Sequence, residues 1–221
     1  MKKYYYNGLE ILTPFSIISN EPHFDMTTVS LKTQRTSQNH QRWELSFNTL
    51  GTENTEVDSF FSSFEGIDSV KKMIMPQLNS VADSALIDSN GEDDYPVVTS
   101  AAAGSNLVFV VANPNISGTL KKGSFIKFSN HDKVYVLTQD FEISSSLNKQ
   151  LYIYPSLRES IPSNTTVKHG NSVTYNSDNT INVANSGCVL SYYVDINNQT
   201  GITFQDGILS NLGTISLIEA I

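Results

Sequence analysis

The sequence predicts a mainly β protein with one α-helix, and three observations support this fold class. Only 16% of the 221 residues are charged, and Ser, Thr and Asn fill much of the difference, a composition that suits strands and turns better than long helices. Short segments of alternating apolar and polar residues recur along most of the chain. Only one segment has the 3.6-residue apolar period of a helix.

Two strands are predicted in the first fifty residues. In "TTVSLKT" (27–33), Val29 and Leu31 fall on one face, and in "RWELSF" (42–47), Trp43, Leu45 and Phe47 do the same. The polar run between the two segments predicts a hairpin connection or a loop.

The helix is predicted over about residues 54–65, within "NTEVDSFFSSFEG". Thr55 and Asp58 resemble a capping box at its start, and Gly66 ends it. Apolar residues at i, i+3, i+4 and i+7 form a stripe that we interpret as core packing against a sheet. The residues of this stripe are Val57, Phe60, Phe61 and Phe64. A strand, "VKKMIMP" (70–76), is predicted next.

Residues 97–171 are predicted to form an inserted small β-barrel. Five short strands separated by polar turns fit a Greek-key barrel such as the OB-fold. They are "NLVFVVAN", "SFIKFS", "KVYVLT", "QLYIYP" and "TTVKH". This segment has seven Lys and Arg against four Asp and Glu, whereas residues 1–96 have seven against 14 and residues 172–221 have none against four. The net charge is thus positive in this segment and negative on both sides of it, which supports a module with its own surface.

The segments on either side of this module are expected to share a second domain. The acidic stretch 77–96 is interpreted as a solvated linker, because its oxygen ligands miss the spacing of a calcium loop around Gly91. The strands "CVLSYYVDI" and "GTISLIEAI" are expected to return to the sheets of the N-terminal part. We therefore predict a β domain of residues 1–96 and 172–221, since neither end alone is able to complete a core.

The sequence gives no sign of an enzyme, a cofactor or a metal site. The four histidines lack the i, i+4 spacing of a helical zinc site, and the single cysteine, Cys188, opens an apolar run and is interpreted as buried. Glycoside hydrolysis stays a disfavoured alternative, because the spacing of paired carboxylates is set in three dimensions. No segment has the roughly 20 apolar residues that span a bilayer, so no membrane insertion is expected.

A ligand surface on the predicted barrel is a second hypothesis. Exposed aromatic rings beside lysines are how OB-folds hold single-stranded nucleic acid. The net charge of −8 disfavours sequence-specific nucleic-acid binding, and half of the aromatics should fill the barrel, so a nucleic-acid ligand is disfavoured. The residues concerned are Phe125, Lys127, Tyr135, Tyr152 and Tyr154.

The segment "GTLKKGSFIKFSNHDKVYVLT" resembles the barrel signature of distal tail proteins from long-tailed bacteriophages. Ser124 replaces the aspartate that is usual in the family. "LYIYPSLRESI" resembles the aromatic strand that follows in the family, and the predicted helix with "KKMIMP" resembles an earlier helix and strand. The similarity runs from about residue 40 to 170. The matching residues are Gly123, Phe125, Lys127, His131, Lys133, Val134, Tyr135, Tyr154, Pro155, Leu157 and Arg158.

The resemblance implies a structural virion protein made in the host cytoplasm, with no catalytic, cofactor or metal site. Members of the family form a hexameric ring between the tail tube and the tip hub, in a tail tip or baseplate, and an OB-fold domain projects from that ring. The expected architecture is therefore a β-sandwich-like ring-forming domain that carries an inserted OB-fold-like barrel. The expected partners are further copies of the chain, a tube protein and a hub protein. A carbohydrate-binding tail module that contacts the host surface is the alternative.

Overall fold

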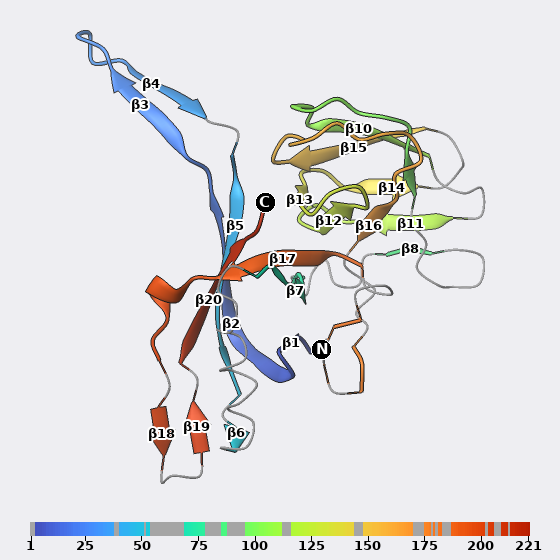
Figure 1. Cartoon of the computed structure of the whole chain (residues 1–221). Helices are drawn as coiled ribbons and strands as arrows, with labels where there is room; N and C mark the ends of the chain where they lie inside the picture. The colour runs from blue at the N-terminus through green and yellow to red at the C-terminus, as the bar shows by residue number, and fades with distance from the viewer. Residues whose placement is uncertain are drawn as a thin grey trace.

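The computed structural model of the chain is mainly β (Figure 1). It describes residues 3–37, 40–50, 52–53, 69–77, 85–87, 96–111, 116–143, 148–169, 175–177, 179, 181–182, 187–201, 203–205, 209–211 and 213–221. In these residues the only helical element is the 3-10 helix Ile196–Asn198 (η2). The mainly β prediction is confirmed. The predicted helix of residues 54–65, with Val57, Phe60, Phe61 and Phe64, lies outside the described residues.

The first six-stranded sheet takes its strands from both ends of the sequence. All of its pairs are antiparallel, and the order is β1 (Tyr5–Tyr6), β2 (Leu9–Asn20), β5 (Arg42–Thr49), β20 (Thr214–Glu219), β17 (Val189–Val194) and β7 (Lys71–Ile74). The strands expected at 42–47, 70–76, 188–196 and 213–221 are therefore confirmed. The C-terminal strands also return to the N-terminal sheet, as expected.

The core of this sheet follows the two-residue period of its central strands. Trp43, Leu45 and Phe47 of β5 are buried, and Ile215 and Leu217 of β20 are buried beside them. Because alternate side chains of a strand point to opposite faces, one alternating run places all of its large apolar residues in a single core.

Two narrow extensions project from this sheet in opposite directions (Figure 1). The upper one is the hairpin of β3 (His23–Thr27) and β4 (Thr33–Ser37), which we call the arm. The lower one contains β18 (Thr203–Gln205), β19 (Leu209–Asn211) and β6 (Thr52–Glu53). Each lengthens the molecule, and all five residues of β3 in the arm are exposed.

The predicted strand over residues 27–33 is wrong, because this segment is the turn at the end of the arm. Leu31 N–H donates to the Thr28 carbonyl and Thr28 N–H donates to the Lys32 carbonyl, both at 2.9 Å. Leu31 has a φ of 61°, which closes the turn and moves its side chain off the face that Val29 was expected to share. The alternation of apolar residues was real, but a turn residue with positive φ does not continue a strand.

The central part of the chain forms a second six-stranded sheet and a three-stranded sheet. The larger has the order β16 (Val167–His169), β12 (Phe125–Phe128), β13 (Val134–Leu137), β15 (Lys149–Tyr154), β10 (Leu107–Val111) and β9 (Val97–Val98), and the smaller has the order β14 (Phe141–Ile143), β11 (Ser117–Leu120) and β8 (Ala85–Ile87). All five predicted strands are confirmed. They form a separate core of buried residues that includes Phe128, Tyr135 and Leu151.

Two expectations about this part need correction. The described strands do not form one closed five-stranded sheet, although a bridge between Val97 and Thr166 brings the outer strands β9 and β16 together. Residues 85–87 are not a solvated linker, because they form β8, which pairs with β11, and Leu86 is completely buried. Three consecutive apolar residues inside a polar stretch are too few to show the alternating pattern of a strand.

Candidate functional site

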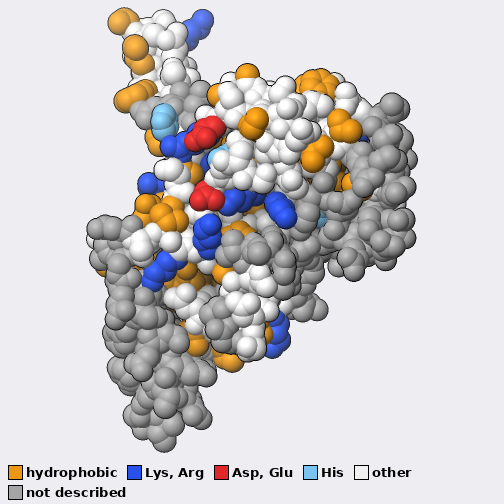
Figure 2. Space-filling view, turned by 45° about the vertical axis from the view of Figure 1, so that its right-hand side comes forward, with side chains coloured by type: hydrophobic (Ala, Val, Ile, Leu, Met, Phe, Trp, Pro, Cys, Tyr) orange, Lys and Arg blue, Asp and Glu red, His pale blue; other side chains and the backbone are white. Residues whose placement is uncertain are grey.

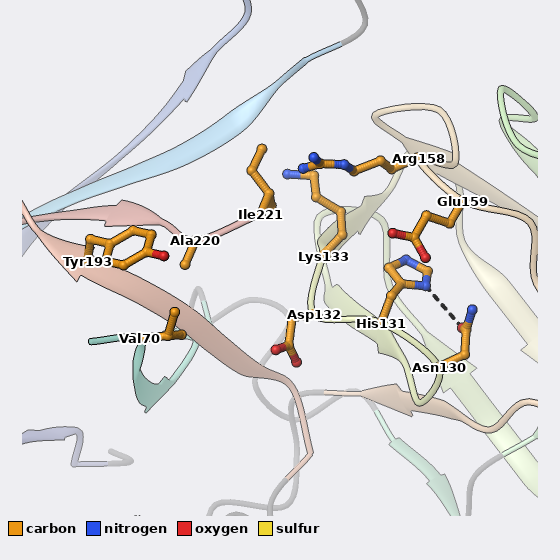
Figure 3. A pocket seen from close by; sticks show the side chains of 10 residues that line it. All are labelled: Val70, Asn130, His131, Asp132, Lys133, Arg158, Glu159, Tyr193, Ala220 and Ile221. Carbon is orange, nitrogen blue, oxygen red and sulfur yellow. Dashed lines mark hydrogen bonds between the residues drawn. The ribbon is translucent and has the colours of Figure 1, made fainter. Parts of the chain in front are cut away.

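A cleft of about 420 Å³ lies between the two six-stranded sheets. On one side are residues 130–133 from the β12–β13 turn, with Arg158 and Glu159 after β15 (Figure 3). Val70, Tyr193 and Ile221 lie on the other side with Ala220 and give it an apolar surface. Each of these three apolar side chains is between 39% and 46% exposed, so the cleft is open to solvent and its apolar side is uncovered.

Beside the cleft, Lys133 of the turn forms an ion pair with Glu219 of β20 across the two sheets. The exposed fractions of the two side chains are 3% and 0%. Lys133 Nζ also donates to Gln41 Oε1 at 2.6 Å. Burial lowers the pKa of Lys133 and raises the pKa of Glu219, because both charged forms lose hydration, and the attraction between the two charges opposes each shift.

Glu219 is satisfied by backbone donors from both sheets in addition to the lysine. Its carboxylate accepts from Trp43 N–H at 3.0 Å and from Val134 N–H at 2.9 Å. A buried carboxylate is tolerated when its charge is paired and its lone pairs have donors. Glu219 therefore joins β20, β5 and β13 at a single point.

Trp43 makes a second connection between the sheets. Its indole Nε1–H donates to the Val134 carbonyl at 2.8 Å, and its ring meets the edge of Phe125, with ring centroids 5.4 Å apart. Lys133 Nζ lies 5.8 Å from the centroid of the same ring. The contact between the two sheets thus combines apolar packing with buried hydrogen bonds, as a fixed interface does.

His131 is held in the wall of the cleft by two hydrogen bonds. Tyr135 Oη accepts from Arg158 N–H at 3.2 Å and lies 2.8 Å from His131 Nε2, which accepts the tyrosine hydrogen when Nδ1 carries the ring proton. Nδ1–H then donates to Asn130 Oδ1 at 3.0 Å (Figure 3). Burial lowers the pKa of His131 and raises the pKa of Tyr135 to about 12. The imidazole is therefore a neutral structural element that orients the turn.

The structure separates the residues proposed for a ligand surface. Phe125 and Tyr135 are buried and belong to the two cores. Lys127 forms an ion pair with Asp132. Tyr152 and Tyr154 remain partly exposed and line a second cleft of about 300 Å³ with Glu21, Gln41 and Asn106.

Tyr154 also bridges the second sheet to the base of the arm. Its hydroxyl donates to Glu21 Oε2 at 3.0 Å and lies 3.1 Å from Ser19 Oγ. Burial raises the pKa of this hydroxyl. Tyr154 thus connects β15 to the end of β2, which no pattern in the sequence indicated.

Sequence reasoning also missed the main contact between the sheets. Glu219 occupies an inward position of the alternating strand "TISLIE", and this alternation is the only sequence signal for its burial. Cys188 is buried, as expected, and burial raises the pKa of its thiol. Among the described residues there is no group of three or more His, Cys, Asp or Glu able to hold a metal. No helix in that part is long and apolar enough to cross a membrane.

Comparison with known proteins matches residues 88–176 to the family described as the B domain of distal tail protein pb9. This segment is therefore similar to a distal tail protein B domain. The match includes β9 to β16, and with them the turn that carries Lys133. No curated protein matches the chain.

The B-domain match confirms the resemblance that the sequence motifs indicated. The match is consistent with a structural component of a bacteriophage tail, which is part of the virion. The B domain covers less than half of the chain. In this structure it contacts the first sheet through Lys133, Val134 and Phe125.

Proposed function

We propose that the chain forms a ring that connects the tail tube to the tip hub in a tail tip or baseplate. The observation that carries this proposal is the match of residues 88–176 to a distal tail protein B domain. The role is architectural, and neither a catalytic residue nor a cofactor is assigned. The partners are further copies of the chain, in a homo-hexamer, together with a tube protein and a hub protein.

We further propose that the first sheet is the ring-forming domain, built from the flanks expected at residues 1–96 and 172–221. In this proposal residues 97–171 form an OB-fold-like insertion, to which β8 (Ala85–Ile87) also belongs because it pairs with β11. The chain passes from β7 to the insertion and returns to β17, and these strands are neighbours in the first sheet. Met75 N–H donates to the Cys188 carbonyl at 2.9 Å, so the two ends of the intervening segment lie together. An insertion with adjacent ends leaves the host sheet intact.

Cyclic assembly requires each subunit to bury two different patches, one against each neighbour. Two such patches are the arm, where all five residues of β3 are exposed, and the cleft between the two sheets.

Native mass spectrometry and electron microscopy of the purified full-length chain test the proposal. A closed ring of six subunits, formed by the protein alone or with tube or hub partners, is expected. A chain that stays monomeric at high concentration and in the presence of both partners would contradict it.

Carbohydrate binding is a second candidate, favoured by one observation. The cleft of Tyr152 and Tyr154 joins aromatic surface to Glu21, Gln41 and Asn106, and aromatic rings with carboxylate and amide groups suit a sugar. Glycan-array binding that Tyr152→Ala abolishes would support this function. Tyr152 is the better test residue, because Tyr154 also holds the base of the arm. Binding unchanged by Tyr152→Ala, or an array without signal, would exclude this cleft as a glycan site.

A further inference from the structure

The arm carries apolar side chains that no part of its own subunit covers. Val29 and Leu31 at its turn are 105% and 85% exposed, and Phe24 and Met26 on β3 are 68% and 64% exposed. Figure 2 shows these hydrophobic groups along the upper projection, beyond the body of the molecule. Scattered exposed apolar residues are ordinary, but four on one narrow projection mark an interaction surface.

The turn presents this surface in a defined shape. Thr28 Oγ1 lies 3.0 Å from Ser30 Oγ and accepts from Lys32 N–H at 3.2 Å, which adds to the two backbone hydrogen bonds of the turn. Leu31 occupies the left-handed region, with a φ of 61°, where glycine or asparagine is easier to place. A leucine held there with its side chain in water buries nothing inside its own subunit, and this outlier motivates the hypothesis of a contact outside it.

The same chain offers a receptor for this turn. The cleft between the sheets has an uncovered apolar side formed by Val70, Tyr193 and Ile221, and its volume of about 420 Å³ accommodates several side chains. An apolar projection and an apolar cleft at different places on one chain make a heterologous contact, which repeats from subunit to subunit and closes into a ring when the rotation allows.

Each surface also carries a charged residue that suits the other, and Arg158 adds one positive charge to the same rim. Lys32 is exposed beside Leu31, and Glu159 is exposed at the rim of the cleft. Neither side chain forms an ion pair with any residue in the part of the chain that the structure describes. The other acidic residue at the rim, Asp132, is already paired with Lys127. Glu159 is therefore the rim carboxylate available to a lysine from a second subunit.

We propose that the turn of the arm, with Val29 and Leu31, inserts into the cleft between the sheets of a neighbouring copy of this chain, where Lys32 pairs with Glu159. This inference rests on the proposed ring function and adds the contact that joins one subunit to the next. It also gives the B domain a part in assembly, since Glu159 belongs to the matched segment and Tyr193 to the first sheet.

Disulfide cross-linking between two single-substitution chains tests the contact directly. Full-length Leu31→Cys and full-length Tyr193→Cys are co-expressed with different tags and oxidised, and Cys188 stays in both because it is buried. A mixed disulfide between the two chains is expected. The control pairs Leu31→Cys with Phe109→Cys instead of Tyr193→Cys. Phe109 lies on β10 outside the cleft and is 41% exposed, so this pair should give no cross-link.

Charge exchange gives an independent test. Lys32→Glu and Glu159→Lys should each weaken assembly severalfold, and the double variant should restore it, because the pair is re-formed with its signs reversed. Val29→Ser with Leu31→Ser should abolish assembly and leave the unfolding midpoint of the subunit unchanged, because both side chains are already in water. Assembly that none of these variants changes would overturn the inference.

The outcomes separate this inference from the function on which it rests. Rings without the Leu31–Tyr193 cross-link would refute the contact and leave the ring function standing. Cross-linked open chains of subunits would support the contact and contradict the closed ring. Absence of both rings and cross-links would refute both.

Discussion

Lys133 and Glu219 form a buried ion pair that joins the turn between β12 and β13 to the last strand of the first sheet. The two residues are 86 positions apart, and each comes from a different six-stranded sheet. Removal of one partner leaves a buried charge uncompensated, which costs far more than the pair contributes relative to apolar residues.

Lys133→Met should therefore lower the free energy of unfolding by about 3–5 kcal/mol, measured by urea denaturation. Lys133→Met with Glu219→Gln should be less destabilised than Lys133→Met alone, because the neutral amide no longer carries an unpaired charge. If the changes in the free energy of unfolding caused by the two single substitutions add up to that of the double variant, the two residues are not energetically coupled.

Substitution of Trp43 should separate packing from hydrogen bonding at the same interface. Trp43→Ala should cost about 3–5 kcal/mol, since the side chain is buried. Trp43→Phe keeps a ring against Phe125 but leaves the Val134 carbonyl without its donor, which should cost about 1–3 kcal/mol. Phe109→Ala, at an exposed position, is the control and should change the free energy of unfolding by less than about 0.5 kcal/mol. A larger effect would show that the exposed fraction of a side chain does not predict the cost of its substitution.

Stability should depend on pH through His131. Burial lowers its pKa in the folded protein below the ordinary value of 6.5, so the unfolded chain binds more protons in the interval between the two values. Stability should therefore fall as the pH falls below about 6.5. His131→Gln should flatten this part of the profile. Parallel profiles for wild type and His131→Gln would contradict the expectation.

Two glycines of similar φ should respond differently to a methyl group. At Gly213, with φ of 66°, a Cβ would lie 2.5 Å from the Gly201 carbonyl oxygen and also contact Thr200 Oγ1. At Gly104, with φ of 83°, no atom lies within 4 Å of such a Cβ. Both alanine variants carry backbone strain of about 1–2 kcal/mol, and Gly213→Ala should lose a further 1–3 kcal/mol or so to the clash. Equal thermal shifts would mean that the backbone near Gly201 yields.

The alternation of apolar and polar residues predicted the strands well, because a strand with one buried face needs an apolar residue at every second position. Trp43, Leu45 and Phe47 were placed on the buried face from the letters alone, and "CVLSYYVDI" was placed in a strand. The same reasoning failed at Val29 and Leu31. Their alternation came from a turn with one residue at positive φ, and spacing alone does not distinguish these cases.

The contacts between the sheets were outside the reach of sequence patterns. Nothing local marks Glu219 as the partner of Lys133, since the pairing depends on where two separate sheets meet. Phe125 and Tyr135 were proposed for a surface and are buried, because both faces of β12 and β13 are covered in part: one by their own core and the other by the first sheet. The alternation of residues along a strand does not reveal that a second sheet also covers its outer face.

The ion pair across the sheets limits how such a module is inherited. A segment attached only through its two ends would be free to move between tail genes by recombination, because any replacement with adjacent termini would fit. Here the first sheet contributes a carboxylate whose counter-charge is encoded in the transferable segment. A recombinant that acquires a foreign segment without a lysine at this turn inherits an unneutralised acid, so a successful exchange must bring a lysine to the turn or replace the glutamate as well.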